Sequence, residues 1–319
     1  MAGKLNEDKD FQAANEAFEK GRFAEAMELL TEAAARYPNE PEVQQRLGLC
    51  AFERATQRLR NDISTPADWR AAVEHLEAAL AFGDNRKIAN SLAVAHHNLG
   101  VHLNLEEAFK EAQGQFHRAL SINPEMTEVS VSLAVNHADQ GELDTAEELL
   151  RAAVERSPDS HQARYTLALV LRAQGKDAEA VEQFKQAQSL EQDDVTLHYN
   201  RGVSYANQGN VEEAEAAFRQ ALELNPESVP ALYNLGLILH QQGKLSQAEG
   251  CFEEVTRLDP ESPGSHLCLA TLYEKRDPAL AIPAWERYLE VAARLPSEAE
   301  TAAKVARHLT SLKKKAEEA

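Results

Sequence analysis

The sequence predicts an all-α protein built from tandem pairs of helices, and three observations support this fold class. Small residues recur at steps of 34 along most of the 319-residue chain. Within each step, apolar residues follow helical spacing on both sides of a glycine. A proline closes most of the steps, and it biases the residue before it away from helical geometry. We therefore expect each 34-residue unit to form two helices joined by a short turn.

Five series of residues share this period. The small residues of the first helix are Gly100, Ala134, Ala168, Gly202, Gly236 and Ala270. The first alanine series of the second helix is Ala112, Ala146, Ala180, Ala214 and Ala248. The bulky residues four positions later are Phe116, Leu150, Phe184, Phe218 and Phe252. A further small series comprises Ala119, Ala153, Ala187 and Ala221, followed by Val255. The closing prolines are Pro124, Pro158, Pro226 and Pro260, and Gln192 stands at the remaining place.

Two kinds of glycine have separate structural roles in these units. Glycines between the two helices favour a left-handed helix end. They are Gly141, Gly175, Gly209 and Gly243. The small residues Gly202 and Ala214 mark a close approach of the two helices of one pair, and we expect Phe218 to fill the space beside them.

The pattern resembles the tetratricopeptide repeat, a 34-residue helix–turn–helix unit. Leu99-Gly100 and Leu235-Gly236 match its first helix, and Ala214, Phe218, Ala221 and Pro226 match its second. The resemblance implies an α-solenoid, a right-handed superhelix, with a concave inner face. We expect eight repeats, at residues 7–40, 41–86, 93–126, 127–160, 161–194, 195–228, 229–262 and 263–296.

The second repeat departs from this pattern by 12 extra residues, at about 53–70. This insertion contains Arg54, Arg58 and Arg60 and a helix-start signal at Thr65–Asp68. The arginines either hold an acidic group or pair with Asp62 and Asp68, and the second alternative is favoured because surface charges usually pair locally. Residues 87–92 are expected to lengthen the first helix of the third repeat.

Residues 297–319 are expected to form a capping helix after the last repeat. Ser297 and Glu300 have the spacing of a capping box at its start. One face of this helix is apolar, and lysines lie near its end. A polar outer face on a terminal helix keeps the exposed end of a repeat stack soluble.

The resemblance implies that the first helices line the concave face, and position arithmetic then selects its side chains. The candidate partner-binding residues are His97, Asn98, Val101, Val131, Tyr165, Leu169, Tyr199, Asn200, Val203, Tyr233, Asn234 and Leu237. Apolar pockets edged with amides suit a peptide-like segment of a partner. The Lys, Asn and Arg set with which some family members bind a terminal carboxylate is missing, and acids outnumber bases on this face. A neutral or basic segment is therefore favoured.

Composition excludes several other classes of function. The net charge of −19 argues against nucleic-acid binding, which requires clustered cations. No run of 18 apolar residues is present, so no membrane segment is expected. Residues 1–12 lack the apolar core of a signal peptide, and the three cysteines imply no disulfide framework. These features favour a cytoplasmic protein.

No catalytic, metal or cofactor site is predicted. His96, His97 and His102 lack the spacing of a zinc site. Cys50, Cys251 and Cys268 are interpreted as small packing groups, because none has a base suitably placed on its helix.

The sequence therefore predicts a non-enzymatic scaffold or adaptor that binds another protein. Two alternatives remain open: a structural protein that assembles with copies of itself, and a regulatory subunit of an enzyme on a separate chain. The identity of the partner is not predicted.

Overall fold

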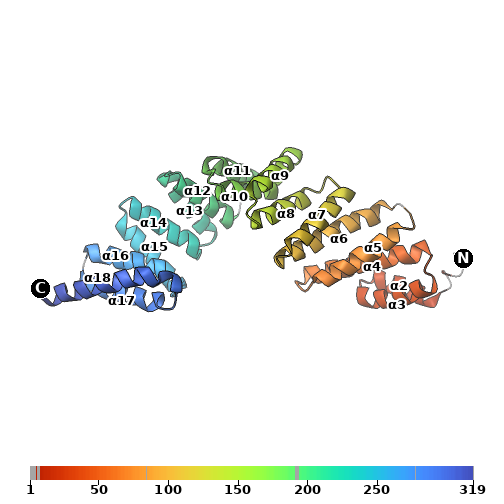
Figure 1. Cartoon of the computed structure of the whole chain (residues 1–319), viewed down its shortest axis with the longest axis horizontal. Helices are drawn as coiled ribbons and strands as arrows, with labels where there is room; N and C mark the ends of the chain where they lie inside the picture. Colours follow the sequence, from red (N-terminus) through yellow and green to blue (C-terminus); the bar gives the residue numbers. More distant parts are fainter. Residues whose placement is uncertain (1–4, 6–7, 84, 191–193, 277, 319) are drawn as a thin grey trace. The chain divides into compact units, whose positions relative to one another are not determined.

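The computed structural model describes residues 5, 8–83, 85–190, 194–276 and 278–318, with backbone only for 278, 279 and 315–318. This part of the chain contains 17 α-helices and one 3-10 helix, and no strand occurs among the described residues. Consecutive helices are joined by short turns and pack as antiparallel pairs (Figure 1). The all-α class and the tandem arrangement of helices predicted from the sequence are confirmed.

The chain divides into two compact units, Met1–Thr166 and Leu167–Ala319, with the boundary inside α10 (His161–Ala173). The helices of the first unit before α10 are α2 (Lys9–Glu19), α3 (Phe23–Arg36), α4 (Pro41–Arg60), α5 (Pro66–Leu80), α6 (Arg86–Leu105), α7 (Phe109–Ile122), α8 (Thr127–Asp139) and α9 (Leu143–Arg156). Its core includes the fully buried Trp69, Leu76 and Phe116.

The second unit continues the same alternation after α10. Its helices are α11 (Asp177–Leu190), α12 (Val195–Asn207), α13 (Val211–Leu224), α14 (Val229–Gln241), α15 (Leu245–Leu258), α16 (Pro263–Arg276), α17 (Pro278–Ala292), the 3-10 helix η1 (Pro296–Glu298) and α18 (Ala299–Glu318). Phe218, Phe252 and Tyr288 lie in its core.

The turns inside the helix pairs use left-handed backbone, as the sequence predicts. Gly141, Gly175, Gly209 and Gly243 have φ between 76° and 80°. In the turn between α6 and α7, the residue 34 positions before Gly141 is Glu107, which adopts the same region with φ 60°. The fold therefore imposes this conformation even where the residue is not glycine.

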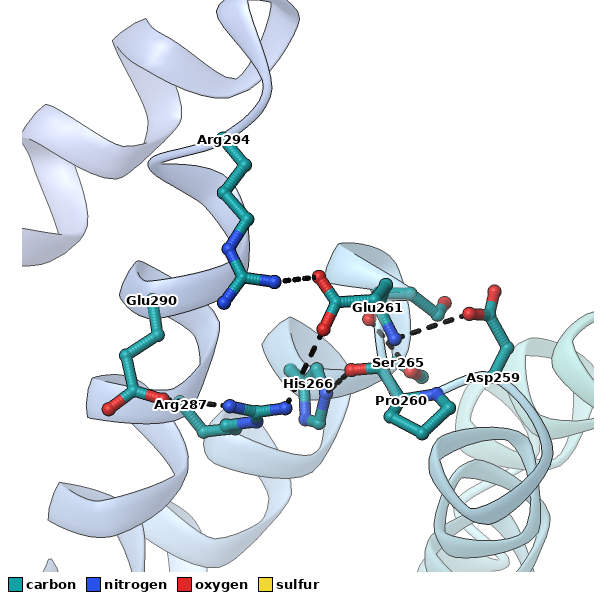
Figure 2. Close-up of polar contacts among 9 residues, drawn as sticks. Asp259, Pro260, Glu261, Ser265, His266, Arg287, Glu290 and Arg294 are labelled. Carbon is teal, nitrogen blue, oxygen red and sulfur yellow. Dashed lines mark hydrogen bonds and ion pairs between the residues drawn. The ribbon is translucent and has the colours of Figure 1, made fainter.

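The closing prolines end the second helices as predicted. Asn123 and Asn225 precede prolines and have extended backbone, with ψ of 94° and 93°. Figure 2 shows the equivalent turn at Pro260. Its Glu261 lies within 2.6 Å of Arg294, in the turn after α17, and 3.8 Å from Arg287 of α17. Such ion pairs connect a turn to the next pair of helices.

The close approach expected at Gly202 is confirmed. A Cβ atom at Gly202 would lie 2.7 Å from Cε1 of Phe218, and a Cβ at Gly100 would lie 2.6 Å from Cε1 of Phe116. Real Cβ atoms essentially never come so close, so alanine at either position would require the ring to shift.

The insertion lengthens α4 and contains the capped start of α5. Thr65 and Asp68 form a complete capping box at the start of α5. Arg58 Nε donates a hydrogen bond to Asp68 at 2.9 Å, which supports the local pairing favoured from the sequence. Burial tends to raise the pKa of Asp68, but the hydrogen bonds from Thr65 and Arg58 outweigh it, so the pKa lies below its usual value.

The start of the C-terminal helix differs from the prediction. Residues Pro296–Glu298 form η1 and α18 begins at Ala299, so Ser297 does not cap an α-helix across Glu300. Glu300 instead pairs with Lys304 at 2.7 Å, one helical turn away. Val305, Leu309 and Leu312 are buried on the predicted apolar face.

Candidate functional site

Within each unit, the first helices of successive pairs contact one another and so share a face. In the first unit α6 contacts both α4 and α8, and in the second unit α12 contacts α14. The side chains that these helices expose on the shared face determine which ligands can bind there.

A pocket of about 190 Å³ opens on this face of the first unit. Val101 and Leu105 of α6 and Val131 and Val135 of α8 form its walls, and the ring of Phe116 from α7 contributes to its lining. The other lining residues are Asn104, Ser132, Gln162 and Thr166. No lining residue carries a charge, so the pocket favours an apolar or neutral group.

A second pocket, of about 130 Å³, lies on the corresponding face of the second unit. Its lining residues are Leu237, His240, Phe252, Leu267, Cys268 and Thr271. All six stand four repeat periods after residues of the first pocket; Leu237 corresponds to Val101 and Phe252 to Phe116. The same place in the repeat thus forms a pocket in both units.

The glycine of the first helix allows each pocket to form. At Gly100 and Gly236, the rings of Phe116 and Phe252 occupy space that a Cβ atom would otherwise need. Each ring is fully or almost fully buried, yet one part of it reaches the pocket. Each glycine therefore leaves room for a ring that contributes to the lining of the pocket.

A chain of amides fixes the rim of the first pocket. Asn104 Nδ2 donates to Asp139 at 2.8 Å, while its Oδ1 accepts from Asn136 at 2.6 Å. Asn136 is fully buried and also donates to the Phe109 carbonyl at 3.2 Å. Neither asparagine is among the candidate residues predicted from the sequence, although an asparagine at a position that is apolar in other repeats, such as Asn136, is a detectable signal.

The candidate aromatic residues pack on the phenylalanine of their own helix pair. His97 lies 6.0 Å from Phe116, and Tyr199 lies 6.0 Å from Phe218, measured between ring centroids. Tyr233 lies 5.9 Å from Phe252 in an edge-to-face arrangement. All three remain partly exposed. Each ring therefore packs against the phenylalanine of its own helix pair and leaves part of its surface exposed.

The candidate asparagines differ in exposure and partners. Asn98 and Asn234 are partly exposed, and each donates to a carbonyl one turn earlier, at Val94 and Pro230. Asn200 is only 6% exposed and belongs to the interior of its unit. An amide that already binds its own helix is held in one orientation, which limits its choice of ligand groups.

The remaining candidates are aliphatic, apart from Tyr165. Val101, Leu169 and Val203 are partly exposed, Leu237 is exposed, and Val131 is 2% exposed. Tyr165 is partly exposed and stacks on His161. The structure thus brings Val101 and Val131 together in the first pocket and places Leu237 in the second.

The three histidines considered as metal ligands have separate partners. His96 contacts Gln115, His97 contacts Ser132 and His102 contacts Ser64, at 2.7 to 2.9 Å. Across the described residues, no group of three His, Cys, Asp or Glu side chains is placed to hold a metal ion.

Burial raises the pKa of all three thiols, to about 11 for Cys50. Each thiol is therefore protonated at neutral pH, which is consistent with a packing role. None of the described helices is both long and apolar enough to cross a membrane.

Three family models described as tetratricopeptide or TPR repeats match the sequence, and together they cover more than half of it. They match residues 11–57 and 199–263, residues 168–209, and residues 128–152. The chain belongs to the tetratricopeptide repeat family. A search of curated proteins found no matching sequence.

Solved tetratricopeptide structures share the fold at low sequence identity. The C-terminal part of a TPR repeat-containing protein from Cytophaga hutchinsonii matches with a TM-score of 0.61 and 15% identity, over 81% of this chain and 99% of that one. YrrB, described as a TPR protein with an unusual peptide-binding site, matches with a TM-score of 0.51 and 22% identity, over 59% and 97%. A MamA structure matches with a TM-score of 0.50 and 19% identity, over 51% and 95%.

Proposed function

We propose that this tetratricopeptide chain is a non-enzymatic scaffold that binds a neutral or basic, peptide-like segment of another protein along its first helices. The observation that carries the proposal is the recurrence of an uncharged, largely apolar pocket at one position of the repeat, at Phe116 and again at Phe252. Pockets at fixed intervals suit the regularly spaced side chains of an extended or helical segment.

The electrostatic setting favours the same class of ligand. The protein carries a net charge of −19, while the pockets themselves are uncharged apart from the titratable His240. Apolar side chains of the ligand supply affinity, and the surrounding negative potential disfavours an acidic segment. The description of YrrB as peptide-binding is consistent with this use of the fold.

A display library of short unstructured peptides tests the proposal directly. The wild-type protein should enrich neutral or basic peptides with spaced apolar residues. Leu237→Trp fills the second pocket and should weaken selected peptides that use it by about tenfold or more. The matched control is Leu245→Trp, because Leu245 has nearly the same exposure, 40% against 38%, but lies on the second helix α15.

Two outcomes of the library experiment would contradict the proposal. One is the absence of any enriched peptide, and the other is an equal loss of affinity in Leu237→Trp and Leu245→Trp. Salt supplies a further check: raising the ionic strength should weaken the complexes only modestly. A loss of several powers of ten would show that charge, rather than the apolar pockets, dominates the contact.

A further inference from the structure

Arg201 occupies a position that leucine occupies in the neighbouring repeats. It stands directly before Gly202 on α12, where the equivalent residues are Leu99, Leu133, Leu167, Leu235 and Leu269. Those leucines are between 1% and 6% exposed, and Arg201 is 9% exposed. A guanidinium group has therefore replaced an aliphatic side chain in the interior of the second unit.

The partners of this buried cation are neutral. Arg201 Nη2 donates to Gln220 Oε1 at 2.5 Å and lies 3.3 Å from His198 Nδ1, and Nη1 donates to Gln188 Oε1. Among the described residues no carboxylate forms an ion pair with Arg201, and its buried Nε has no hydrogen-bond partner. Burial accordingly lowers the pKa of the guanidinium, which remains charged at neutral pH. A buried charge without a counter-charge is unfavourable and calls for an explanation.

The partners of Arg201 line an open cavity of about 480 Å³ between α11 and α13. Gln188, Gln220 and His198 all belong to its wall, together with Lys185 and Glu223. Because each glutamine directs its amide oxygen to the guanidinium, its amide N–H groups are directed away from Arg201. Gln188 itself replaces an aliphatic residue, since Leu120 and Leu222 stand at the equivalent positions.

We propose that this cavity binds a carboxylate group, which supplies a counter-charge to Arg201 that no described residue provides. The charges of Lys185 and Glu223 sum to zero among the residues that line the cavity, so Arg201 adds one net positive charge beside it, which suits a monovalent anion. A carboxylate accepts hydrogen bonds from the two amides and from Lys185, and by displacing an amide oxygen it can pair directly with the planar guanidinium. The carboxylate belongs either to a small organic acid or to an acidic side chain of a protein.

The test uses the full chain and the variant Arg201→Leu, which restores the residue of the neighbouring repeats. Sodium acetate replaces sodium chloride at constant ionic strength, while ¹⁵N-edited NMR follows the Arg201 Nε–H signal and circular dichroism follows Tm. In the wild type, the Arg201 Nε–H signal should shift with increasing acetate and reach a limiting position, and Tm should rise. In Arg201→Leu the rise in Tm should disappear, although the variant stays folded because leucine suits the site.

Two further variants test whether acetate binds in this cavity or at arginines in general. Lys185→Ala alters an exposed side chain and should weaken acetate binding severalfold while the helical signal is unchanged. Arg257→Gln removes an exposed arginine on α15 and should leave acetate binding as in the wild type. An unsaturable response in the wild type, an equal response in Arg201→Leu, or an equal response to chloride would each overturn the proposal.

A capped peptide with one glutamate, and its glutamine analogue, then identify the source of the carboxylate. Tighter binding of the glutamate peptide than of acetate assigns the site to an acidic side chain of a protein, and weaker binding assigns it to a small organic acid. Equal binding of the glutamate and glutamine peptides would contradict a carboxylate site.

Discussion

The pockets at Phe116 and Phe252 occupy the same place in the repeat but have different walls. Asn104 and Ser132 of the first pocket correspond to His240 and Cys268 of the second, and the volumes are about 190 and 130 Å³. The glycine–phenylalanine contact beneath them is nearly identical. The repeat framework therefore determines where a pocket forms, while a few wall residues determine which group it accepts.

The largest expected effect comes from removing either ring. Phe116→Ala and Phe252→Ala should each lower the free energy of unfolding by about 3–5 kcal/mol, because both rings are buried and a cavity would remain. Urea unfolding followed by circular dichroism measures this loss. Phe82→Ala serves as a control, since Phe82 is 37% exposed. A clearly smaller loss at one of the two buried sites would show that the pockets are not equivalent.

Glycine substitutions should sharpen the comparison with a smaller effect. Gly236→Ala should destabilise the protein by about 1–3 kcal/mol, because its Cβ would lie 2.7 Å from the Phe252 ring. Gly250→Ala on α15 meets no atom within 4 Å and should stabilise the protein by up to about 1 kcal/mol.

In the first unit, Gly100 faces the Phe116 ring and Gly114 meets no atom within 4 Å. Gly100→Ala should therefore destabilise the protein and Gly114→Ala should stabilise it, as at Gly236 and Gly250. Thermal unfolding of the four single variants provides the measurement. If alanine were tolerated equally at Gly236 and Gly250, the close ring contact would not be required for the fold.

The smallest effect depends on pH and concerns only the second unit. Lys244, with further hydrogen bonds from Arg219 and Gln242, lowers the pKa of Glu215 to about 2, against a tendency of burial to raise it. A carboxyl group with a lowered pKa stabilises the fold fully above its unfolded pKa of about 4.5, and this contribution disappears as the pH falls towards 2.

Glu215→Gln should therefore cost about 1 kcal/mol at pH 7, a modest value because solvent screens the pair. At pH 2 the difference between variant and wild type should be close to zero. Urea unfolding at the two pH values measures it, and a loss of stability that is independent of pH would exclude the ion pair as its cause.

The helical pairs and their small residues could be predicted because they follow a strict period. Gly202 and Phe218 meet as expected, since size and spacing alone determine that contact. The pocket linings could be predicted only in part. Position arithmetic selects Val101, but it does not show that Phe116 reaches the same pocket from α7. The limits of the individual repeats remain a prediction.

The exposure of individual side chains and their hydrogen-bond partners could not be predicted from the sequence, because both depend on residues of other helices. Asn200 and Asn234 occupy equivalent positions, yet one is buried and the other is partly exposed, because the side chains of adjacent helices differ. The role of Arg201 likewise depends on Gln188 and Gln220, which come from two other helices. Such networks are set by three-dimensional neighbours rather than by period.

The left-handed backbone of Glu107 has a practical consequence for engineering the first unit. A side chain in this region strains the turn, which glycine would relieve without altering any residue that lines a pocket. This turn is therefore a suitable place to add thermal tolerance to the protein, for example before more disruptive changes are introduced into its binding face.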